Sequence, residues 1–275
     1  MRGCGQSLAR EGRAYRCPRL HSFDLARTGY LNLLQPQDRR SANPGDTRGA
    51  AEARRRLYDA GHGAPLIAEL ERQLAAFDPP PRPAVLDVGC GEGSPLAALA
   101  AALPFAAHGL DLSAPAIELA ARRYGDLGNT SSGDATWVVA NADRFVPYAA
   151  DTFDVVLALS SRLDAGEAGR VLAPNGRLLV ATPAADDLVE LREALLGEGQ
   201  HRDRMARTIA ALAPAFVPEA RATVRHVATL DGAGVRDALA ATYRGGRRSQ
   251  QARLATLGPM RVTMSHEVAR FRRAR

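Results

Sequence analysis

At the centre of the chain lies the sequence AVLDVGCGEGS, residues 84–94, in which an apolar strand runs into a glycine-rich turn. Val85, Leu86 and Val88 supply the apolar side chains of a short buried strand. The glycines of the turn let the backbone bend tightly and approach a ligand, because they carry no Cβ. A helix predicted over residues 95–103 would direct its first N–H groups to the same point. The stretch therefore predicts a ligand site where a parallel strand ends.

Acidic residues make this signal more specific than a glycine turn alone. Asp87 lies at the end of the strand, Glu92 interrupts the glycines, and Asp111 ends the next predicted strand, residues 108–112. A carboxylate in the position of Asp111 accepts hydrogen bonds from both ribose hydroxyls of a nucleoside. The chain lacks the pyrophosphate fingerprint G-x-G-x-x-G, which counts against a nicotinamide or flavin dinucleotide. A glycine turn with a purely structural role is the remaining interpretation.

The motif resembles the V-L-D-x-G-C-G-x-G signature of the class I S-adenosylmethionine (AdoMet)-dependent methyltransferases, and the resemblance extends over residues 83–183. It implies an α/β fold with a Rossmann-like, doubly wound sheet. It also implies S-adenosyl-L-methionine as the cofactor. The residues that the resemblance assigns to cofactor binding are Asp87, Gly89, Gly91, Glu92, Gly93, Ser94, Asp111, Leu112, Asn141 and Ala142.

The pattern on either side of the motif supports this fold. Helices are expected over residues 48–58, 65–77 and 114–124, the last with Ser113 as its N-cap. Further strands are expected over residues 137–140, 153–159, 222–230 and 260–268, with a turn into another strand over 170–180.

Length and composition limit the possible classes of protein. The 275 residues suffice for one α/β domain and a small extra module. No apolar run approaches the ~20 residues of a membrane span, and the arginine-rich N-terminus does not have the pattern of a secretory signal, so a cytoplasmic protein without a membrane partner is expected. The net charge of +6 comes from arginine without any lysine, which suits a polyanionic partner but also fits a GC-rich genome.

The N-terminal residues contain candidate metal ligands. Cys4, Cys17 and His21 follow the spacing C-x12-C-x3-H, and thiolate and imidazole groups are the ligands that zinc prefers. A closed structural site needs four ligands. A C-x2-C pair would place another cysteine at position 1, which is Met1. Either the true start lies upstream, or three protein ligands hold the metal, or no metal is bound.

The sequence that follows resembles one family closely. HSFDLARTGYLNLL (residues 21–34), NPGD (43–46) and DAGH (59–62) resemble the bacterial 23S rRNA (guanine-N1)-methyltransferases, which include macrolide and tylosin resistance enzymes. The resemblance implies Zn²⁺ in an N-terminal module, a 23S rRNA hairpin as partner, a homodimer, and methylation of guanine N1. It divides the chain into a zinc-ribbon-like, RNA-recognising module (1–35), a helical linker (36–80) and a methyltransferase domain (81–275).

The chain departs from that family where the acceptor base is expected. Ser160-Ser161-Arg162-Leu163 replaces the family's aromatic-Ala-Pro-Arg, and Arg162 is the candidate catalytic residue, as a cation at guanine O6. No residue identifies itself as the general base. Asp187 replaces a cofactor-contacting histidine and Gly63 a tyrosine, so no role is transferred to either position. These differences keep open a class I methyltransferase acting on a small molecule, or a catalytically weakened paralogue.

A basic segment, residues 243–248, has two interpretations. It is either a phosphate-binding loop or an exposed arginine-rich loop without a function in binding.

Overall fold

The computed structural model describes residues 4–35, 44–125, 135–196, 203–242 and 257–274. Its centre is an eight-stranded sheet with the strand order β10-β11-β9-β8-β5-β6-β7-β4. The parallel strands of this sheet are β4 (Leu31–Asn32), β5 (Ala84–Val88), β6 (Ala106–Asp111), β7 (Thr136–Val139), β8 (Phe153–Leu159) and β9 (Leu172–Pro183). The long hairpin of β10 (Phe216–Leu230) and β11 (Met260–Arg273) continues the sheet in antiparallel fashion.

This topology confirms the doubly wound α/β fold. The chain starts in the middle with β5, moves outward through β6 and β7, and returns to the other side through β8 and β9. β8 has the bounds that its apolar pattern predicts, and Ser113 caps its helix by accepting a hydrogen bond from the Ala116 N–H at 3.2 Å. β9 begins at Leu172, directly after a helix over residues 165–171, and so includes the residues that were expected to form a turn before the strand.

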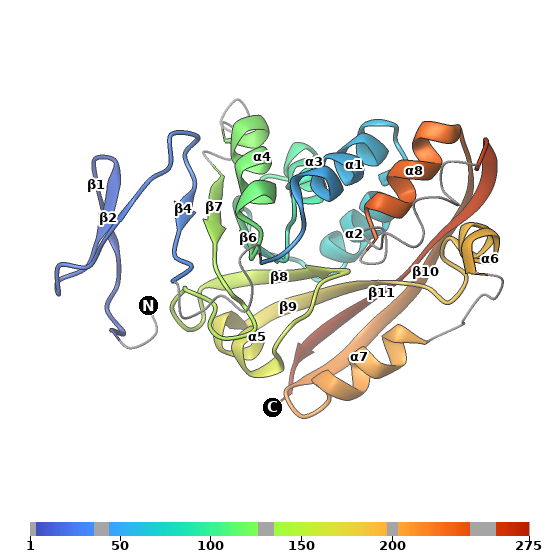
Figure 1. The fold of residues 1–275 in the computed structure, drawn as a ribbon. Coiled ribbons are helices and arrows are strands. Elements are labelled where there is room, and N and C mark those ends of the chain that lie inside the picture. Colours follow the sequence, from blue (N-terminus) through green and yellow to red (C-terminus); the bar gives the residue numbers. More distant parts are fainter. Residues whose placement is uncertain (1–3, 36–43, 126–134, 197–202, 243–256, 275) are drawn as a thin grey trace.

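Helices cover both faces of the sheet (Figure 1). On one face lie α1 (Arg48–Asp59), α2 (Ala64–Ala75), α3 (Ser94–Ala102), α4 (Ala114–Tyr124) and α8 (Gly232–Ala240). The other face carries α5 (Ala165–Val171) and α7 (Arg204–Leu212). α6 (Val189–Leu196) lies beside the end of the β10–β11 hairpin and packs with α8 in a third apolar cluster. Each face has its own apolar core, with Trp137 and Leu99 in one and Phe153 and Phe271 in the other. None of the helices that the structure describes combines the length and apolar character that crossing a bilayer requires.

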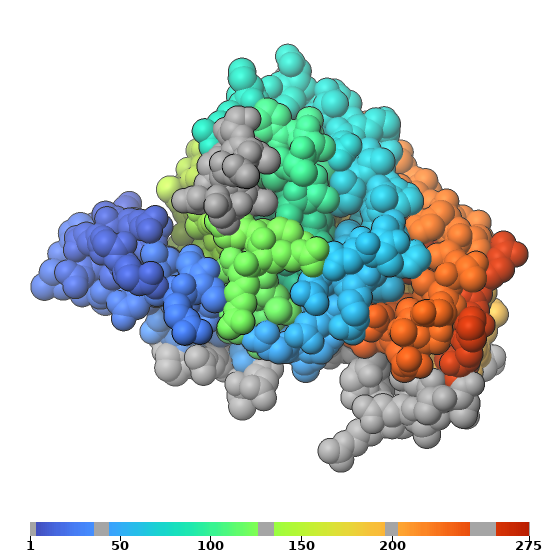
Figure 2. Space-filling view, turned by 90° about the horizontal axis from the view of Figure 1, so that it is seen from above, coloured from blue at the N-terminus to red at the C-terminus, as the bar shows by residue number. Residues whose placement is uncertain are grey.

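The N-terminal residues form a small sheet of their own. β1 (Ala9–Glu11), β2 (Ala14–Arg16) and β3 (Ser22–Asp24) are antiparallel neighbours, and they project from the body of the molecule (Figure 2). β4 follows immediately and pairs with β7, with Leu31 opposite Val138. The last residues before position 35 are thus part of the main sheet.

Candidate functional site

The glycine turn between β5 and α3 adopts the conformation that its sequence requires. Gly89, Gly91 and Gly93 have φ angles of +76°, +57° and +83°, in the region that disfavours side chains. Neighbours also exclude a side chain: a Cβ on Gly89 would lie 2.4 Å from Ser161 Cβ, and one on Gly93 would lie 2.6 Å from Trp137 Cη2. The turn is therefore closely packed backbone that other residues cannot provide.

Two carboxyl groups beside the turn have oxygens without a protein partner. Both oxygens of Asp87 and Oε1 of Glu92 are buried and have no hydrogen bond among the described residues. Burial, with the charges of Asp111 and Glu92, raises the pKa of Asp87 to about 8. Burial raises the pKa of Glu92 as well, although Ser94 Oγ donates to its Oε2 at 2.6 Å. Such orphaned carboxylates fit a cationic ligand, because a cation would compensate their lost hydration.

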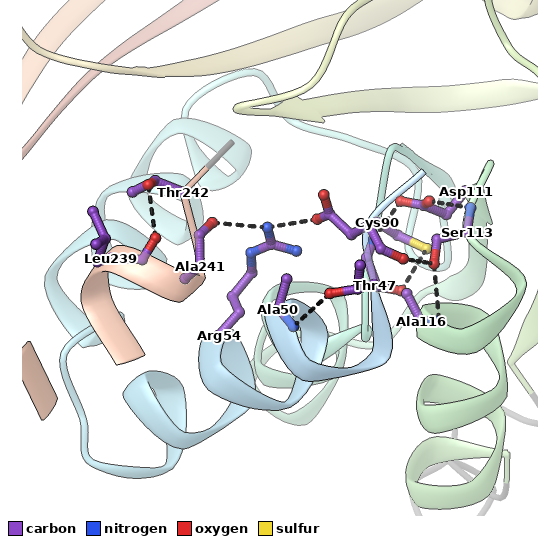
Figure 3. A network of polar contacts seen from close by, with 12 residues as sticks. Thr47, Ala50, Arg54, Cys90, Asp111, Ser113, Ala116, Leu239, Ala241 and Thr242 are labelled. Atoms are coloured by element: carbon purple, nitrogen blue, oxygen red, sulfur yellow. Dashed lines mark hydrogen bonds and ion pairs between the residues drawn. The ribbon is translucent and has the colours of Figure 1, made fainter. Parts of the chain in front are cut away.

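Asp111 lies at the end of β6 and fixes the neighbouring loops. Its Oδ2 accepts the Gly91 N–H at 2.8 Å, and its Oδ1 accepts the Ser113 N–H at 2.7 Å (Figure 3). Each carboxylate oxygen can accept a further hydrogen bond, so these contacts leave capacity for two hydroxyls. Burial raises the pKa of Asp111. Leu112 follows and packs partly against the core.

A segment before α1 crosses the same end of the sheet. Gly45 packs so closely on Ser113 that a Cβ there would lie 2.7 Å from the Ser113 backbone nitrogen. Ser113 Oγ donates to the Asp46 carbonyl at 2.7 Å, and Arg54 Nη2 donates to Asp46 Oδ2 at 2.8 Å. Sequence reasoning recognised the turn residues of this segment but did not place it, or Arg54, at the site.

The remaining residues predicted to bind the cofactor follow β7. The Asn141 side-chain oxygen accepts the Asp143 N–H at 3.1 Å, which closes a tight turn, and Ala142 is partly buried. The Ala140 N–H donates to the Asp111 carbonyl at 3.0 Å. The ends of β5, β6 and β7 thus bring the glycine turn, Asp111 and Asn141 to one edge of the sheet.

The loop after β8 borders this edge. Ser161 Oγ donates to the Val88 carbonyl, so the loop is held against the end of β5. Arg162 is exposed and has no hydrogen bond or ion pair among the described residues. Asp187, beyond the end of β9, accepts the Ser265 N–H at 3.0 Å, and burial raises its pKa to about 6. The basic residues 243–248 lie outside the described residues.

The three N-terminal candidate ligands are brought together. Their ligand atoms lie within 4.8 Å of one another, with 3.8 Å between Cys4 Sγ and Cys17 Sγ and 3.3 Å between Cys17 Sγ and His21 Nδ1. Two sulfurs on a tetrahedral zinc at about 2.3 Å would stand about 3.8 Å apart, so the cluster fits zinc. Met1 lies outside the described residues, so the structure adds no fourth ligand.

Two profiles of protein families match the chain. Residues 4–42 match the profile described as the N-terminal region of RlmA, a zinc ribbon, and residues 85–176 match a methyltransferase domain. The solved structure of a Bacillus halodurans C-125 protein superimposes with a TM-score of 0.52 at 14% identity, covering 74% of this chain and 98% of that one. At that identity the likeness shows the fold alone.

Curated relatives extend over nearly the whole chain. A protein of Micromonospora griseorubida, provisionally named a 23S rRNA (guanine-N(1)-)-methyltransferase, is 36% identical, and the match covers 98% of this chain and 95% of that protein. The 23S rRNA (guanine(748)-N(1))-methyltransferase of Streptomyces fradiae is 34% identical over 83% of this chain and 78% of its own length. With its zinc-ribbon and methyltransferase regions in the same order, the chain belongs to the family of bacterial 23S rRNA (guanine-N1)-methyltransferases.

Proposed function

We propose that this protein transfers a methyl group from AdoMet to N1 of a guanine in a hairpin loop of 23S rRNA. The observation that carries the proposal is the near full-length match to relatives named for this activity. The glycine turn with its orphaned carboxylates supports it, because AdoMet is a cationic nucleoside. Because bacterial rRNA is located in the cytoplasm, we also propose that the protein acts there.

The cofactor roles follow from the positions of the residues. Gly89, Gly91 and Gly93 would cradle the methionine part, with Ser94 opening α3 beside them, and Asp87 and Glu92 would face its positive charges. Asp111 would bind the ribose hydroxyls, while Leu112, Asn141 and Ala142 would border the adenine. AdoMet supplies an activated methyl group on a sulfonium, so the protein's task is to position the acceptor and exclude water.

Arg162 is the proposed catalytic residue. Guanine N1 carries a proton that must leave before or during methylation, and the negative charge then spreads to O6. The exposed guanidinium of Arg162, on the loop whose Ser161 contacts the end of β5, supports a role in stabilising that oxygen. We assign no general base.

The N-terminal residues are the proposed RNA-recognising part. Cys4, Cys17 and His21 would hold Zn²⁺, within a module of residues 1–35 that precedes a helical linker (36–80) and the methyltransferase domain (81–275). The family resemblance also leads us to propose a homodimer, which size-exclusion chromatography with light scattering would test.

The test is methylation of a 23S rRNA transcript by purified protein with labelled AdoMet. Mass spectrometry of the digested nucleosides should reveal N1-methylguanine. Arg162→Ala should lower kcat by about a hundredfold with little change in AdoMet affinity, as for other lost electrostatic stabilisers. A protein that binds AdoMet but never methylates the transcript would contradict the proposal.

The altered sequence after β8 favours one alternative, a small-molecule acceptor, because Ser160-Ser161 has no aromatic side chain to stack on a base. Turnover without RNA, unaffected by removal of the N-terminal module, would support that alternative. AdoMet binding without product in either assay would indicate a weakened paralogue.

A further inference from the structure

Two side chains of α1 point towards the cofactor site, although sequence reasoning assigned neither to it. Arg54 and Tyr58 are four residues apart and therefore share one face of the helix. Arg54 Nη2 donates to Asp46 Oδ2 at 2.8 Å and to the Ala241 carbonyl at 3.2 Å (Figure 3). Its Nη1 lies 3.0 Å from the point that a Cβ on Gly91 would occupy. The guanidinium thus lies directly against the glycine turn.

The ring of Tyr58 is held in place by a contact that only glycine permits. A Cβ on Gly63 would lie 2.1 Å from Tyr58 Cε1 and 2.3 Å from its Cδ1. Gly63 itself has φ −84° and ψ −13°, an ordinary helical conformation that any residue adopts. The backbone therefore does not require glycine at position 63, whereas the position of the Tyr58 ring does.

The Tyr58 side chain packs against the core on the same helix face as Arg54, which contacts the glycine turn. It is close enough to the acidic residues of the site for their charges to act on it: burial raises the pKa of Tyr58, and the carboxylates of Glu92 and Asp87 raise it further while Arg54 opposes them. The hydroxyl has no hydrogen-bond partner within the part of the chain that the structure describes. Tyr58 thus provides a spare donor one helical turn from Arg54 and near two carboxyl groups with unpartnered oxygens.

We propose that the Tyr58 hydroxyl and the Arg54 guanidinium bind the carboxylate of the methionine part of AdoMet, opposite Asp87 and Glu92, which take its ammonium group. The proposal rests on the AdoMet site proposed above and adds its amino-acid end. An α-amino acid carries both charges on one carbon, and this site offers donors on one side and acceptors on the other. Gly63 belongs to the arrangement because it admits the ring.

A ligand series separates this contact from the rest of the site. Isothermal titration would compare AdoMet with decarboxylated AdoMet, which keeps the sulfonium and the amine but has no carboxylate. Tyr58→Phe should weaken AdoMet binding about tenfold, the value of one hydrogen bond to a charged group, and leave decarboxylated AdoMet unchanged. Tyr15→Phe, in the N-terminal sheet, is the matched control and should change neither.

Gly63→Ala provides a second test that leaves the hydroxyl in the protein. It should weaken AdoMet binding as Tyr58→Phe does, because the ring must move, yet have no further effect in a Tyr58→Ala background. If wild-type protein binds AdoMet and Tyr58→Phe binds it equally well, this inference is wrong and the cofactor proposal stands. If wild-type protein binds no AdoMet, both fail.

Discussion

At the scale of single residues, the site is defined by acids that the protein itself does not neutralise. Asp87 is 1% exposed, and both of its oxygens are without a hydrogen bond among the described residues. Asp111, by contrast, accepts two backbone N–H groups and is oriented by them. Asp87 is thus suited to a positively charged group, and Asp111 to a defined set of hydrogen bonds.

Replacing Asp111 tests the second of these roles. Asp111→Asn should weaken AdoMet binding by at least about tenfold, because an amide has one accepting oxygen in place of two and cannot accept the hydrogen bonds of both the loop and the ribose. Asp78→Asn, on an exposed turn with φ +55°, is the matched control. Equal Kd values for Asp111→Asn and the wild type, measured by titration calorimetry, would remove Asp111 from the site.

The pH dependence of binding tests the role of Asp87. Its raised pKa of about 8, caused by burial and by Asp111 and Glu92, means that the free protein holds this proton at neutral pH. A cationic ligand favours the ionised form, so binding should release a proton below pH 8, and affinity should rise with pH up to about that value. Calorimetry in buffers of different ionisation enthalpy measures the released proton. Asp87→Asn should release none, and a wild type without release would refute the assignment.

At the scale of elements, the stability of the N-terminal sheet depends on a few residues. Its strands have three residues each, and most of their side chains are exposed, so they bury little apolar surface. Cys4 and Cys17 are its buried side chains before residue 25. A bound metal would therefore supply much of its folding free energy.

Removal of that metal should affect methylation of 23S rRNA but not binding of AdoMet. Cys17→Ser, or treatment with a chelator, should abolish methylation of 23S rRNA while AdoMet binding stays within about twofold of the wild type, because the eight-stranded sheet retains its own cores. Metal analysis confirms the loss, and Tyr15→Phe, in the same small sheet but not a candidate ligand, is the control. Full methylation by zinc-free protein would show that the metal site is dispensable.

The elements also show which features the sequence could predict. The parallel strands from β5 to β9 and the turn at Gly89 were predicted because each depends on neighbours in the sequence, whereas β4 was not predicted. The first residues of β10 were missed, since Pro218 and Glu219 are exposed and interrupt the alternation. Arg54 and Tyr58 were missed because Gly91 and Glu92, the residues of the turn that they approach, lie far along the chain from α1. No local pattern encodes the fit of a ring on Gly63.

At the scale of the whole molecule, the net charge of +6 is what remains after many arginines pair with carboxylates. Arg54 and Arg56 of α1, for example, pair with Asp46 and Asp237, which occupies their guanidinium groups. Arg162, by contrast, is exposed and has neither a hydrogen bond nor an ion pair among the described residues. The net positive charge attracts a polyanion such as RNA over long distances.

The net positive charge predicts that methylation of rRNA depends more strongly on salt than binding of AdoMet does. Raising salt from about 50 to 200 mM should lower kcat/KM for rRNA by at least tenfold, because counterions compete for the phosphates. The Kd for AdoMet should change much less, because its charges would be buried at the proposed site. Methylation rates and titrations in the same buffers provide the comparison. An equal fall in kcat/KM for rRNA and in the affinity for AdoMet would argue against RNA binding by charge.

The pairing of β4 with β7 fixes the geometry between the two ends of the molecule. Leu31 lies opposite Val138, and the Leu33 N–H donates to the Val139 carbonyl at 2.9 Å. β7 leads directly into Asn141, so β4, which follows the projecting sheet, pairs with the strand that ends at the proposed nucleoside edge. If the projecting sheet binds rRNA as proposed, its distance from the cofactor site would select the nucleotide that reaches the methyl group, as a ruler would.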